Sequence, residues 1–263
     1  MMLIRRFGPV LLALFAFPAL ALRLATTTSV YDSGLLDELL SAFQKETGIQ
    51  AEVLAVGTGQ ALAIAKRGDA DAALVHAPAL EAQAIREGWI LAHTCLAYNA
   101  FILVGPPKDP ARIREAGNVL EAMRRIAANQ SPFVSRGDRS GTHLKELELW
   151  QKAGLSPSGR WYLESGAGMG QTLRLAWEKE AYTLSDTATY LTVGKKLGLE
   201  ALYTKEDPEL LNQYSFLIVK GVKEEEARKL MDFLLSEEGQ KRIGAYRGGI
   251  FKPLGGRCLI PVK

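Results

Sequence analysis

Four short loops rich in Gly, Ser and Thr each follow an expected strand and lead into an expected helix. They span residues 26–29, 57–60, 135–142 and 165–170. A helix N-terminus presents unpaired backbone N–H groups and the positive end of the helix dipole, so a small loop at that point favours an anion. Hydroxyl groups add neutral hydrogen-bond donors, and glycine lets the backbone approach a ligand closely. Four such loops facing one cleft would form an anion site with little formal charge.

Each loop taken alone has a simpler explanation, because Ser, Thr and Asp cap helices in most α/β proteins. The run of four hydroxyl residues at 26–29 exceeds what one cap requires. Arg136 adds a fork of N–H groups that can bind an oxyanion directly, and Asp138, two residues on, can hold that fork in place. The alternative for this segment is a surface ion pair of Arg136 or Arg139 with Asp138 and no ligand.

Enzymatic functions have weaker support. Ser140, His143 and Asp138 have the residue types of a hydrolase triad, but residues so close together on one loop and helix start rarely reach the required geometry. The sequence has no Gly-x-Ser-x-Gly elbow, and the glycines at 166–170 have the wrong spacing for a dinucleotide fingerprint. The three His are scattered and form no Cys/His metal motif. We therefore expect a binding protein that is not an enzyme, with no cofactor and no metal cation.

The chain has 263 residues and a mass of 28.7 kDa, with 48% hydrophobic residues and 32 Lys+Arg against 29 Asp+Glu. This mixture is typical of a globular protein and excludes disordered, collagenous and disulfide-scaffold classes. Arg5 and Arg6, the apolar run at 10–17 and the Ala-Leu-Ala sequence at 19–21 predict a signal peptide over residues 1–21, cleaved after Ala21. The apolar run is too short to span a bilayer.

Removal of the signal peptide leaves 30 basic residues against 29 acidic ones, so the mature protein is close to neutral. Such a balance gives no general attraction for nucleic acid. We expect an exported, soluble, periplasmic protein. Cys95 and Cys258 form an even pair in an oxidising compartment, where a disulfide and two separately buried thiols are both open.

The order of elements predicts an α/β fold with parallel strands, because short apolar strands alternate with amphipathic helices. His76 directly follows one of these strands and can face a cleft, although a lone His at such a position is more often structural. We expect strands at 22–25, 49–56, 72–75, 133–134 and 161–164, and helices at 32–47, 61–65, 144–154, 171–180, 224–235 and 237–243.

Two longer strands, at 98–105 and 214–221, resemble each other and no other part of the chain. Long strands of this kind can cross between two lobes. Their positions predict lobe I over 22–99 and 218–263, and lobe II over 100–217. The ligand would then lie in the cleft between the lobes, at the carboxyl ends of the strands.

Several of these motifs, in the same order, resemble the tungstate-binding proteins of ABC transporters, the TupA family. The resemblance covers almost the whole mature chain and implies a two-lobed periplasmic binding protein of type II, in the class that also includes molybdate and sulfate binders. It also implies that tungstate or molybdate is delivered to a membrane permease and its ATPase, and we expect a monomer. The matching segments are 26–29 with 32–36, 56–62, 133–138 with 140–143, and 168–170.

Carried over residue by residue, the resemblance implies that both lobes bind the oxyanion. The first lobe would contribute Thr27, Thr28, Ser29, Thr58 and Gly59. The second lobe would contribute Ser135, Arg136, Ser140, Gly141, Thr142, Gly168 and Met169.

Phosphate and sulfate are the alternative ligands, since the loop at 135–142 also resembles the Arg-Ser-Asp-Gly-Ser-Gly-Thr type of loop in phosphate-binding proteins. Tungstate is fully deprotonated at neutral pH, so a carboxylate that points at it would repel it, whereas protonated phosphate can donate to a carboxylate. We therefore expect Asp138 to face Arg136 or backbone amides. Molybdate has nearly the same size and charge as tungstate, and the sequence does not separate the two.

Overall fold

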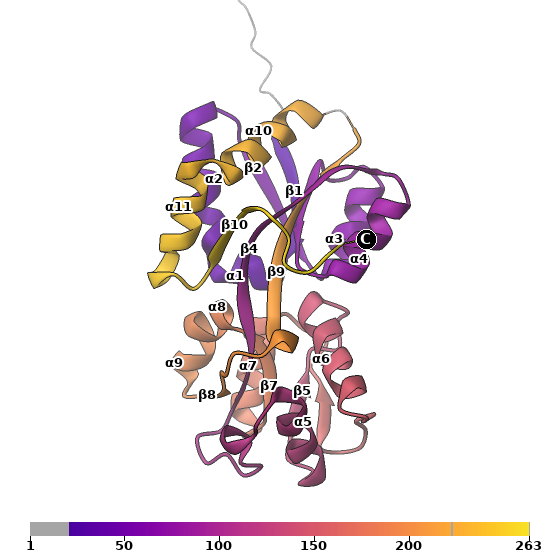
Figure 1. The fold of residues 1–263 in the computed structure, drawn as a ribbon, viewed down its shortest axis with the longest axis vertical. Helices are drawn as coiled ribbons and strands as arrows, with labels where there is room; N and C mark the ends of the chain where they lie inside the picture. Colours follow the sequence, from indigo (N-terminus) through magenta and orange to yellow (C-terminus); the bar gives the residue numbers. More distant parts are fainter. Residues whose placement is uncertain (1–20, 222, 263) are drawn as a thin grey trace, which may run out of the picture.

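The computed structural model describes residues 21–221 and 223–262, so the predicted signal peptide, apart from Ala21, lies outside the described residues. Figure 1 shows two lobes, one above the other, and two long strands that run from one lobe into the other: β4 (Ile90–Gly105) and β9 (Leu211–Val219). Within the described ranges, no helix is long and apolar enough to cross a membrane. The two similar long strands are thus the segments that join the lobes.

The first lobe is built on a mixed sheet with the strand order β10-β4-β9-β3-β1-β2. Helices α2, α10 and α11 lie on one side of this sheet in Figure 1, and α3 and α4 lie on the other. The bounds are β1 (Leu22–Thr27), α1 (Thr28–Ser33), α2 (Leu35–Thr47), β2 (Ala51–Val56), α3 (Thr58–Lys66), β3 (Ala72–Val75), α4 (Pro78–Arg86), α10 (Glu224–Leu235), α11 (Glu237–Ala245) and β10 (Lys252–Gly256).

The second lobe contains the far end of β4, with β7 and β8 paired to it, and a separate parallel pair, β5 and β6. The predicted lobe boundaries at 99/100 and 217/218 stay predictions. The bounds are α5 (Val119–Ala128), β5 (Phe133–Ser135), α6 (Gly141–Lys152), β6 (Tyr162–Glu164), α7 (Met169–Glu178), β7 (Thr183–Asp186), α8 (Thr187–Thr189), α9 (Lys195–Leu197) and β8 (Glu200–Tyr203), with short 3₁₀ or π turns at Ile113–Glu115, Tyr190–Gly194, Pro208–Leu210 and Tyr246–Gly248.

The main sheet is mixed, whereas the sequence predicted parallel strands. The strands of the repeated strand-loop-helix units are parallel, since β1 pairs with β2 and β3, and β5 pairs with β6. The long strands pair antiparallel, because the chain passes to the second lobe along β4 and returns along β9. The parallel prediction therefore holds for the repeated units and is wrong for the strands that join the lobes.

The helix predicted over 32–47 is divided into α1 and α2 at Gly34. Gly34 has a φ of 79°, and its N–H donates to the carbonyl of Tyr31, which ends α1. A Cβ at this glycine would lie 2.8 Å from Tyr246 Oη. Glycine satisfies both demands because it adopts a left-handed conformation without strain and leaves room for the tyrosine. The short helix α1 can therefore point toward the second lobe while α2 covers the sheet.

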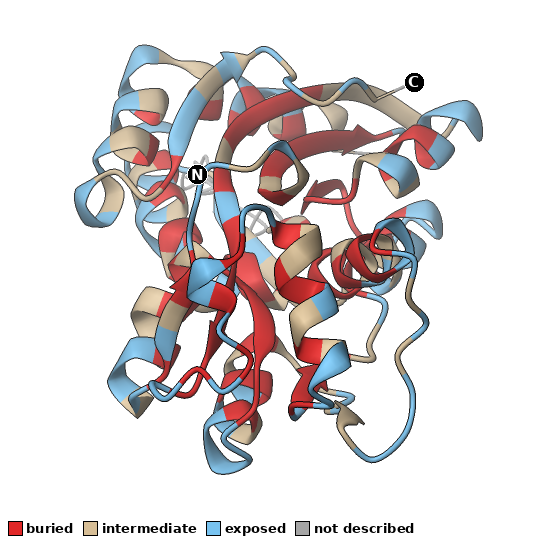
Figure 2. Ribbon diagram, turned by 60° about the horizontal axis from the view of Figure 1, so that its bottom comes forward, coloured by how far each residue is buried: buried red, intermediate tan, exposed pale blue. Residues whose placement is uncertain are grey.

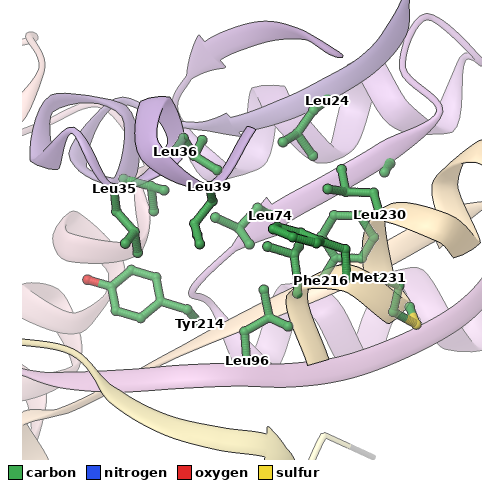
Figure 3. Packing of buried hydrophobic residues seen from close by; sticks show 14 of the residues in the cluster. Leu24, Leu35, Leu36, Leu39, Leu74, Leu96, Tyr214, Phe216, Leu230 and Met231 are labelled. Atoms are coloured by element: carbon green, nitrogen blue, oxygen red, sulfur yellow. The ribbon is translucent and has the colours of Figure 1, made fainter. Parts of the chain in front are cut away.

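Each lobe has its own apolar core. In the first lobe, Leu35, Leu36 and Leu39 on one face of α2 pack into a cluster with residues of β1 and α10 (Figure 3). In the second lobe, Phe133 and Trp150 belong to a different cluster. The central strands are mostly buried (Figure 2), in particular β1, β3, β7 and β9, whereas β2, β6 and β10 are partly exposed. Apart from Ala188 of α8, which packs into the first-lobe cluster, the cores are separate, so the lobes can change their relative position with little repacking.

Cys95 and Cys258 form a disulfide, with their Cα atoms 5.1 Å apart. Of the two alternatives that the sequence left open, the structure selects this one. Cys95 lies on β4, so the bond attaches the C-terminal segment to a strand that joins the lobes.

Candidate functional site

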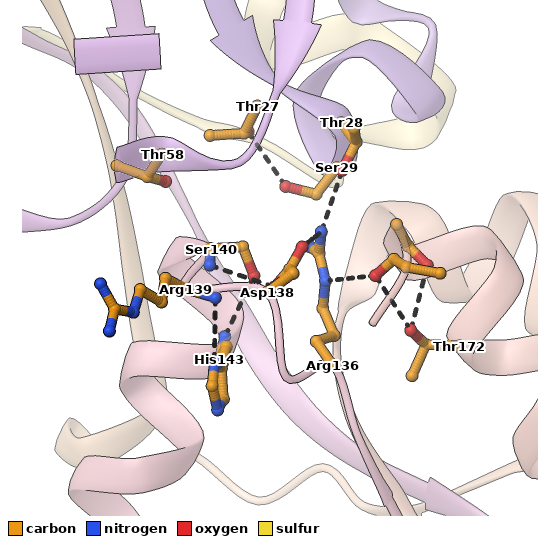
Figure 4. A network of polar contacts seen from close by, with 12 residues as sticks. Thr27, Thr28, Ser29, Thr58, Arg136, Asp138, Arg139, Ser140, His143 and Thr172 are labelled. Carbon is orange, nitrogen blue, oxygen red and sulfur yellow. Dashed lines mark hydrogen bonds and ion pairs between the residues drawn. The ribbon is translucent and has the colours of Figure 1, made fainter. Parts of the chain in front are cut away.

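On the first lobe, three hydroxyl residues stand where β1 passes into α1. Thr27 caps α1, and its Oγ1 accepts a hydrogen bond of 3.4 Å from the backbone N–H of Val30. The hydroxyls of Thr27 and Ser29 lie 3.1 Å apart, and both side chains are buried. Thr28, between them, points to the second lobe (Figure 4). The segment that the sequence predicted to be a loop is therefore a strand end and a helix start aimed at the other lobe.

Thr58 begins α3 on the same lobe and connects the two lobes directly. Its Oγ1 accepts a hydrogen bond of 3.0 Å from the backbone N–H of Gly141, the first residue of α6. A Cβ at Gly57 would lie 3.2 Å from the carbonyl of Asp138, and one at Gly59 would lie 4.0 Å from the carbonyl of Arg139. The small residues of this turn therefore let the backbones of the two lobes approach each other.

Arg136 is the central side chain of the second lobe and is 1% exposed. Its Nη2 donates to Thr28 Oγ1 over 3.0 Å and to Asp138 Oδ2 over 2.5 Å, so the guanidinium contacts both lobes (Figure 4). Its Nη1 has no hydrogen-bond partner among the described residues. Burial lowers the pKa of the guanidinium, and the adjacent carboxylate of Asp138 opposes that shift. A buried cation with an unused N–H group is a strong attractor for an anion.

Both carboxylate oxygens of Asp138 accept hydrogen bonds from its own loop. Oδ2 accepts from Arg136, and Oδ1 accepts from the backbone N–H of Ser140 over 3.1 Å. The prediction that Asp138 faces Arg136 or a backbone amide is confirmed. The carboxylate orients the guanidinium and closes the loop.

The hydrolase triad does not form. Ser140 Oγ caps α6 by accepting from the backbone N–H of His143, and His143 Nδ1 accepts from the backbone N–H of Arg139 over 2.9 Å. Asp138 binds Arg136 and an amide instead of the imidazole. Each of the three residues thus organises backbone at the start of α6, which is the geometry of a cap and not of an activated nucleophile.

Ser135 uses its hydroxyl inside the second lobe. Its Oγ donates to Glu146 Oε2 over 2.7 Å, and Glu146 also accepts from Trp150 Nε1 and Tyr162 Oη. Burial raises the pKa of Glu146, and these three donors oppose the shift. The sequence did not indicate Glu146, because nothing local marks a buried acid on a helix as the partner of a serine eleven residues earlier.

The remaining predicted residues of the second lobe stand at the starts of α6 and α7. Thr142 is buried, and its Oγ1 has no hydrogen-bond partner among the residues that the structure describes. Gly168 caps α7, and a Cβ there would lie 3.4 Å from Thr28 Oγ1. The side chain of Met169 packs in an apolar cluster of the second lobe. Gly168 and Met169 can therefore offer only backbone groups to the space between the lobes.

Two further groups meet the predicted residues, and sequence reasoning assigned neither of them to the site. His76 Nε2 lies 3.0 Å from Ser29 Oγ. Thr189 Oγ1 donates to the carbonyl of Ser29 over 3.4 Å, and Asp186 caps the same short helix, α8, by accepting from the Thr189 N–H. Burial raises the pKa of Asp186. An Asp-Thr-Ala-Thr sequence after a strand is a helix-cap pattern, which was the available signal for this fifth loop.

The structure thus brings most of the predicted residues together between the lobes, whereas the side chains of Ser135 and Met169 point into the second lobe. Hydrogen bonds from Arg136 to Thr28, from Gly141 to Thr58 and from Thr189 to Ser29 join the lobes. In the described part of the chain, several buried polar atoms at this junction have no partner; they are His76 Nδ1, Arg136 Nη1, Thr142 Oγ1 and Asp186 Oδ2. Buried polar groups normally find a partner, so this concentration is typical of a binding site for a polar ligand.

Comparison with known proteins places this geometry in a family. The model of the PBP superfamily domain matches residues 18–238. The tungstate-binding protein TupA of Peptoclostridium acidaminophilum is 45% identical over 230 residues, which cover 85% of this chain and 80% of the relative. The chain belongs to the TupA family. Its long strands, two lobes and α/β architecture are therefore those of a periplasmic binding protein.

Two solved structures support the membership. The tungstate ABC transporter structure from Geobacter sulfurreducens is 43% identical, covers 86% of this TupA-family chain and 98% of its own, and superposes with a TM-score of 0.79. The tungstate-binding protein TupA from Desulfovibrio alaskensis G20 is 38% identical, with coverage of 90% and 99% and a TM-score of 0.75. The similarity thus spans both lobes of the family fold.

Proposed function

We propose that this protein is the solute-binding component of an ABC transporter and that it binds tungstate, or molybdate, in the cleft between its lobes. The observation that carries the proposal is Arg136, a guanidinium that is 1% exposed, contacts both lobes and keeps Nη1 without a partner among the described residues. An oxyanion beside Nη1 would supply the missing acceptor. The names of the relatives supply the identity of the oxyanion.

The arrangement of Asp138 favours a fully deprotonated anion over protonated phosphate. Each carboxylate oxygen already accepts one hydrogen bond, from Arg136 or from the N–H of Ser140, so the carboxylate has less capacity left to accept a proton from a ligand. A hydrogen phosphate needs such an acceptor, whereas tungstate and molybdate need only donors. The junction offers such donors in Arg136, the hydroxyl groups and the helix N-termini, beside the buried carboxyl group of Asp186, whose pKa burial raises.

Titration calorimetry of the mature protein with tungstate, molybdate, sulfate and phosphate tests the ligand. We expect strong binding of tungstate and weak or undetectable binding of phosphate. Tight binding of phosphate without binding of tungstate would contradict the proposal and support the alternative of a phosphate receptor. Equal affinities for tungstate and molybdate would be consistent with a site in which only the charge and the hydrogen bonds of the anion determine its affinity.

The proposal includes export to the periplasm, a permease and an ATPase as partners, a monomeric state and no enzymatic activity. The basic residues, the apolar run and the Ala-Leu-Ala sequence at 19–21 support export, and the backbone role of Ser140 and His143 supports binding over catalysis. N-terminal sequencing of the exported protein checks the first point. We expect the mature chain to begin at Leu22, and an uncleaved N-terminus would contradict that part of the proposal.

A further inference from the structure

The loop at 165–170, which the sequence predicts to be an anion loop, lies beside Arg136 in the second lobe. Arg136 Nε donates to the carbonyl of Ala167 over 3.4 Å, while Nη2 donates to Asp138. Asp138 and Thr172 of α7 lie on opposite sides of the guanidinium in Figure 4. The loop thus contacts the guanidinium at Nε, away from the Asp138 carboxylate.

Ser165 joins the parts of this loop to one another. Its Oγ accepts from the N–H of Ala167 over 3.3 Å and lies 2.8 Å from Thr172 Oγ1. The same Oγ lies 3.3 Å from the carbonyl of Arg136. Thr172 is 0% exposed, and its Oγ1 lies 3.0 Å from the carbonyl of Gly168. A buried threonine on α7 and the backbone on both sides of Ser165 therefore hold this hydroxyl in place.

The two hydroxyl protons can be arranged in two ways, because hydroxyl oxygens 2.8 Å apart share one proton. If Thr172 donates to Ser165, the Ser165 proton goes to the carbonyl of Arg136. If Ser165 donates to Thr172, the Thr172 proton goes to the carbonyl of Gly168. In both arrangements Ser165 Oγ keeps a lone pair for the Ala167 N–H, and neither hydroxyl keeps a proton for a ligand. The pair therefore supports the backbone of the loop in either arrangement.

Two of the three guanidinium nitrogens of Arg136 are fixed by these contacts. The Ala167 carbonyl holds Nε, and Nη2 donates to Asp138 and, across the junction, to Thr28. Since a guanidinium is planar, fixing two nitrogens sets the direction of the third. The third is Nη1, which has no hydrogen-bond partner among the described residues. Ala167 and Asp138 both belong to the second lobe, so this orientation does not require the lobes to close.

On the basis of the proposed function, we propose that Ser165 is a positioning residue that, with Thr172, holds Ala167 so that its carbonyl fixes Arg136 Nε and the guanidinium directs Nη1 at the bound oxyanion. Ser165 does not touch the anion in this arrangement. An arginine side chain loses rotamer freedom when it is ordered by a ligand. Because the loop orders Arg136 before the anion arrives, that loss occurs on folding, and the anion binds more tightly.

Hydrogen exchange of the Arg136 Nε–H, followed by NMR in the ligand-free protein, tests the positioning directly. The signal is assigned by its absence from Arg136→Ala. Loss of one hydrogen bond corresponds to about fivefold in an equilibrium, so we expect the Nε–H to exchange about fivefold faster in Ser165→Ala than in the wild type. Equal exchange rates would overturn the proposal. Absence of any oxyanion binding by the wild type would instead count against the proposed function, and the exchange rates would still decide the role of Ser165.

A pair of substitutions separates the hydroxyl of Ser165 from its packing. Ser165→Ala removes the acceptor for the Ala167 N–H, whereas Ser165→Thr keeps a hydroxyl. We expect Ser165→Ala to weaken tungstate binding about fivefold, and Ser165→Thr to stay within about twofold of the wild type. Ser158→Ala is the control, since Ser158 is an exposed serine of the same lobe. Equal losses in the two Ser165 variants, with unchanged melting temperatures, would contradict a role of the hydroxyl.

A double-mutant cycle with Arg136→Lys tests whether Ser165 acts through Arg136. Lysine keeps the positive charge but has no Nε–H to donate to the Ala167 carbonyl. We expect Ser165→Ala to weaken tungstate binding about fivefold when residue 136 is Arg and by less than about twofold when it is Lys. The same factor in both backgrounds would mean that Ser165 acts independently of the guanidinium, and the proposal would be wrong.

Discussion

The two lobes contribute different chemistry to their junction. The first lobe presents mainly neutral groups, namely the hydroxyls of Thr27, Ser29 and Thr58 (Figure 4) and the imidazole of His76, with the carboxylate of Asp32 near Arg136 as the exception. The second lobe presents the charged pair of Arg136 and Asp138 (Figure 4). Neutral donors hold an anion by geometry, and a buried guanidinium attracts it by charge. Neither surface alone provides both.

This division explains why the site depends on closure. Arg136 is buried and contacts Thr28 of the first lobe, so we expect closure of the lobes to contribute to the exclusion of water from the guanidinium. A charge interaction strengthens as water is excluded. Binding and closure are therefore expected to proceed together, as the first lobe closes over the charged residues of the second lobe.

The largest expected effect is a loss of folding stability at low pH, which arises because His76 is buried as a neutral imidazole. Burial, with the nearby charge of Arg136, lowers the pKa of His76 from 6.5 to about 4. Between these two pH values the unfolded chain binds a proton that the folded chain does not, so the free energy of unfolding falls as the pH falls. The loss reaches about 3 kcal/mol by pH 4.

Urea unfolding at a series of pH values between 7 and 4 measures this loss. Other groups also titrate in that range, so the comparison is with His76→Gln, which has no imidazole. We expect the wild type to lose about 3 kcal/mol more than the variant. Parallel pH dependences for the two proteins would show that His76 does not titrate as a buried neutral group.

The next effect concerns the charged side. Arg136→Ala removes the buried guanidinium and should weaken oxyanion binding by about 1.5 to 3 kcal/mol, which is about 10- to 150-fold in the dissociation constant. Calorimetry with tungstate measures it, and Arg139→Ala is the matched control, because Arg139 lies on the same loop but is exposed. An Arg136→Ala variant with wild-type affinity would remove Arg136 from the site.

The contact between the two sides gives the third prediction. A Cβ at Gly141 would lie 2.7 Å from the backbone carbonyl of His76, so Gly141→Ala forces α6 away from the first lobe. We expect the closed form to lose about 1 to 3 kcal/mol, as for other overpacked contacts. Tungstate binding should weaken accordingly.

Small-angle scattering with and without tungstate measures the closure itself. The wild type should contract on binding, and Gly141→Ala should contract less at the same ligand concentration. Gly221→Ala is the control, since nothing lies within 4 Å of a Cβ at Gly221. Identical dimensions of the wild type with and without tungstate would argue against closure as the step that completes the site.

Local patterns were sufficient for much of the fold. The buried strand predicted at 72–75 and the helix predicted at 224–235 agree with β3 and α10. Apolar periodicity, helix caps and turn residues are encoded within a few neighbouring positions, so one sequence reveals them. The pairing of Asp138 with Arg136 was also predictable, because the two residues are separated by a single glycine.

Other features depend on contacts between distant segments. Ser29 meets His76 across 47 positions and Thr189 across 160, and no local pattern indicates that these residues come together. The antiparallel direction of β4 and β9 follows from the path of the chain between the lobes, which strand composition does not encode. The same holds for the disulfide, since the sequence spacing of two cysteines does not determine the distance between them in the fold.

The smallest expected effect tests the neutral side at a single hydrogen bond. Thr58 Oγ1 accepts from the Gly141 N–H, so Thr58→Val preserves the shape of the side chain and leaves that N–H unpaired when the lobes close. We expect tungstate binding to weaken by about 0.5 to 1.5 kcal/mol, or about 2- to 12-fold. Thr204→Val is the control, because Thr204 is exposed.

The dependence of tungstate affinity on salt distinguishes the effect of Thr58→Val from that of Arg136→Ala. Added salt screens the attraction between an oxyanion and Arg136 but acts little on a hydrogen bond between neutral groups. The ratio of the affinities of the wild type and Thr58→Val should therefore be the same at low and high ionic strength. A loss in Thr58→Val as large as that in Arg136→Ala, or one that changes with salt, would mean that the first lobe also contributes through charge, and the division between a neutral and a charged side would fail.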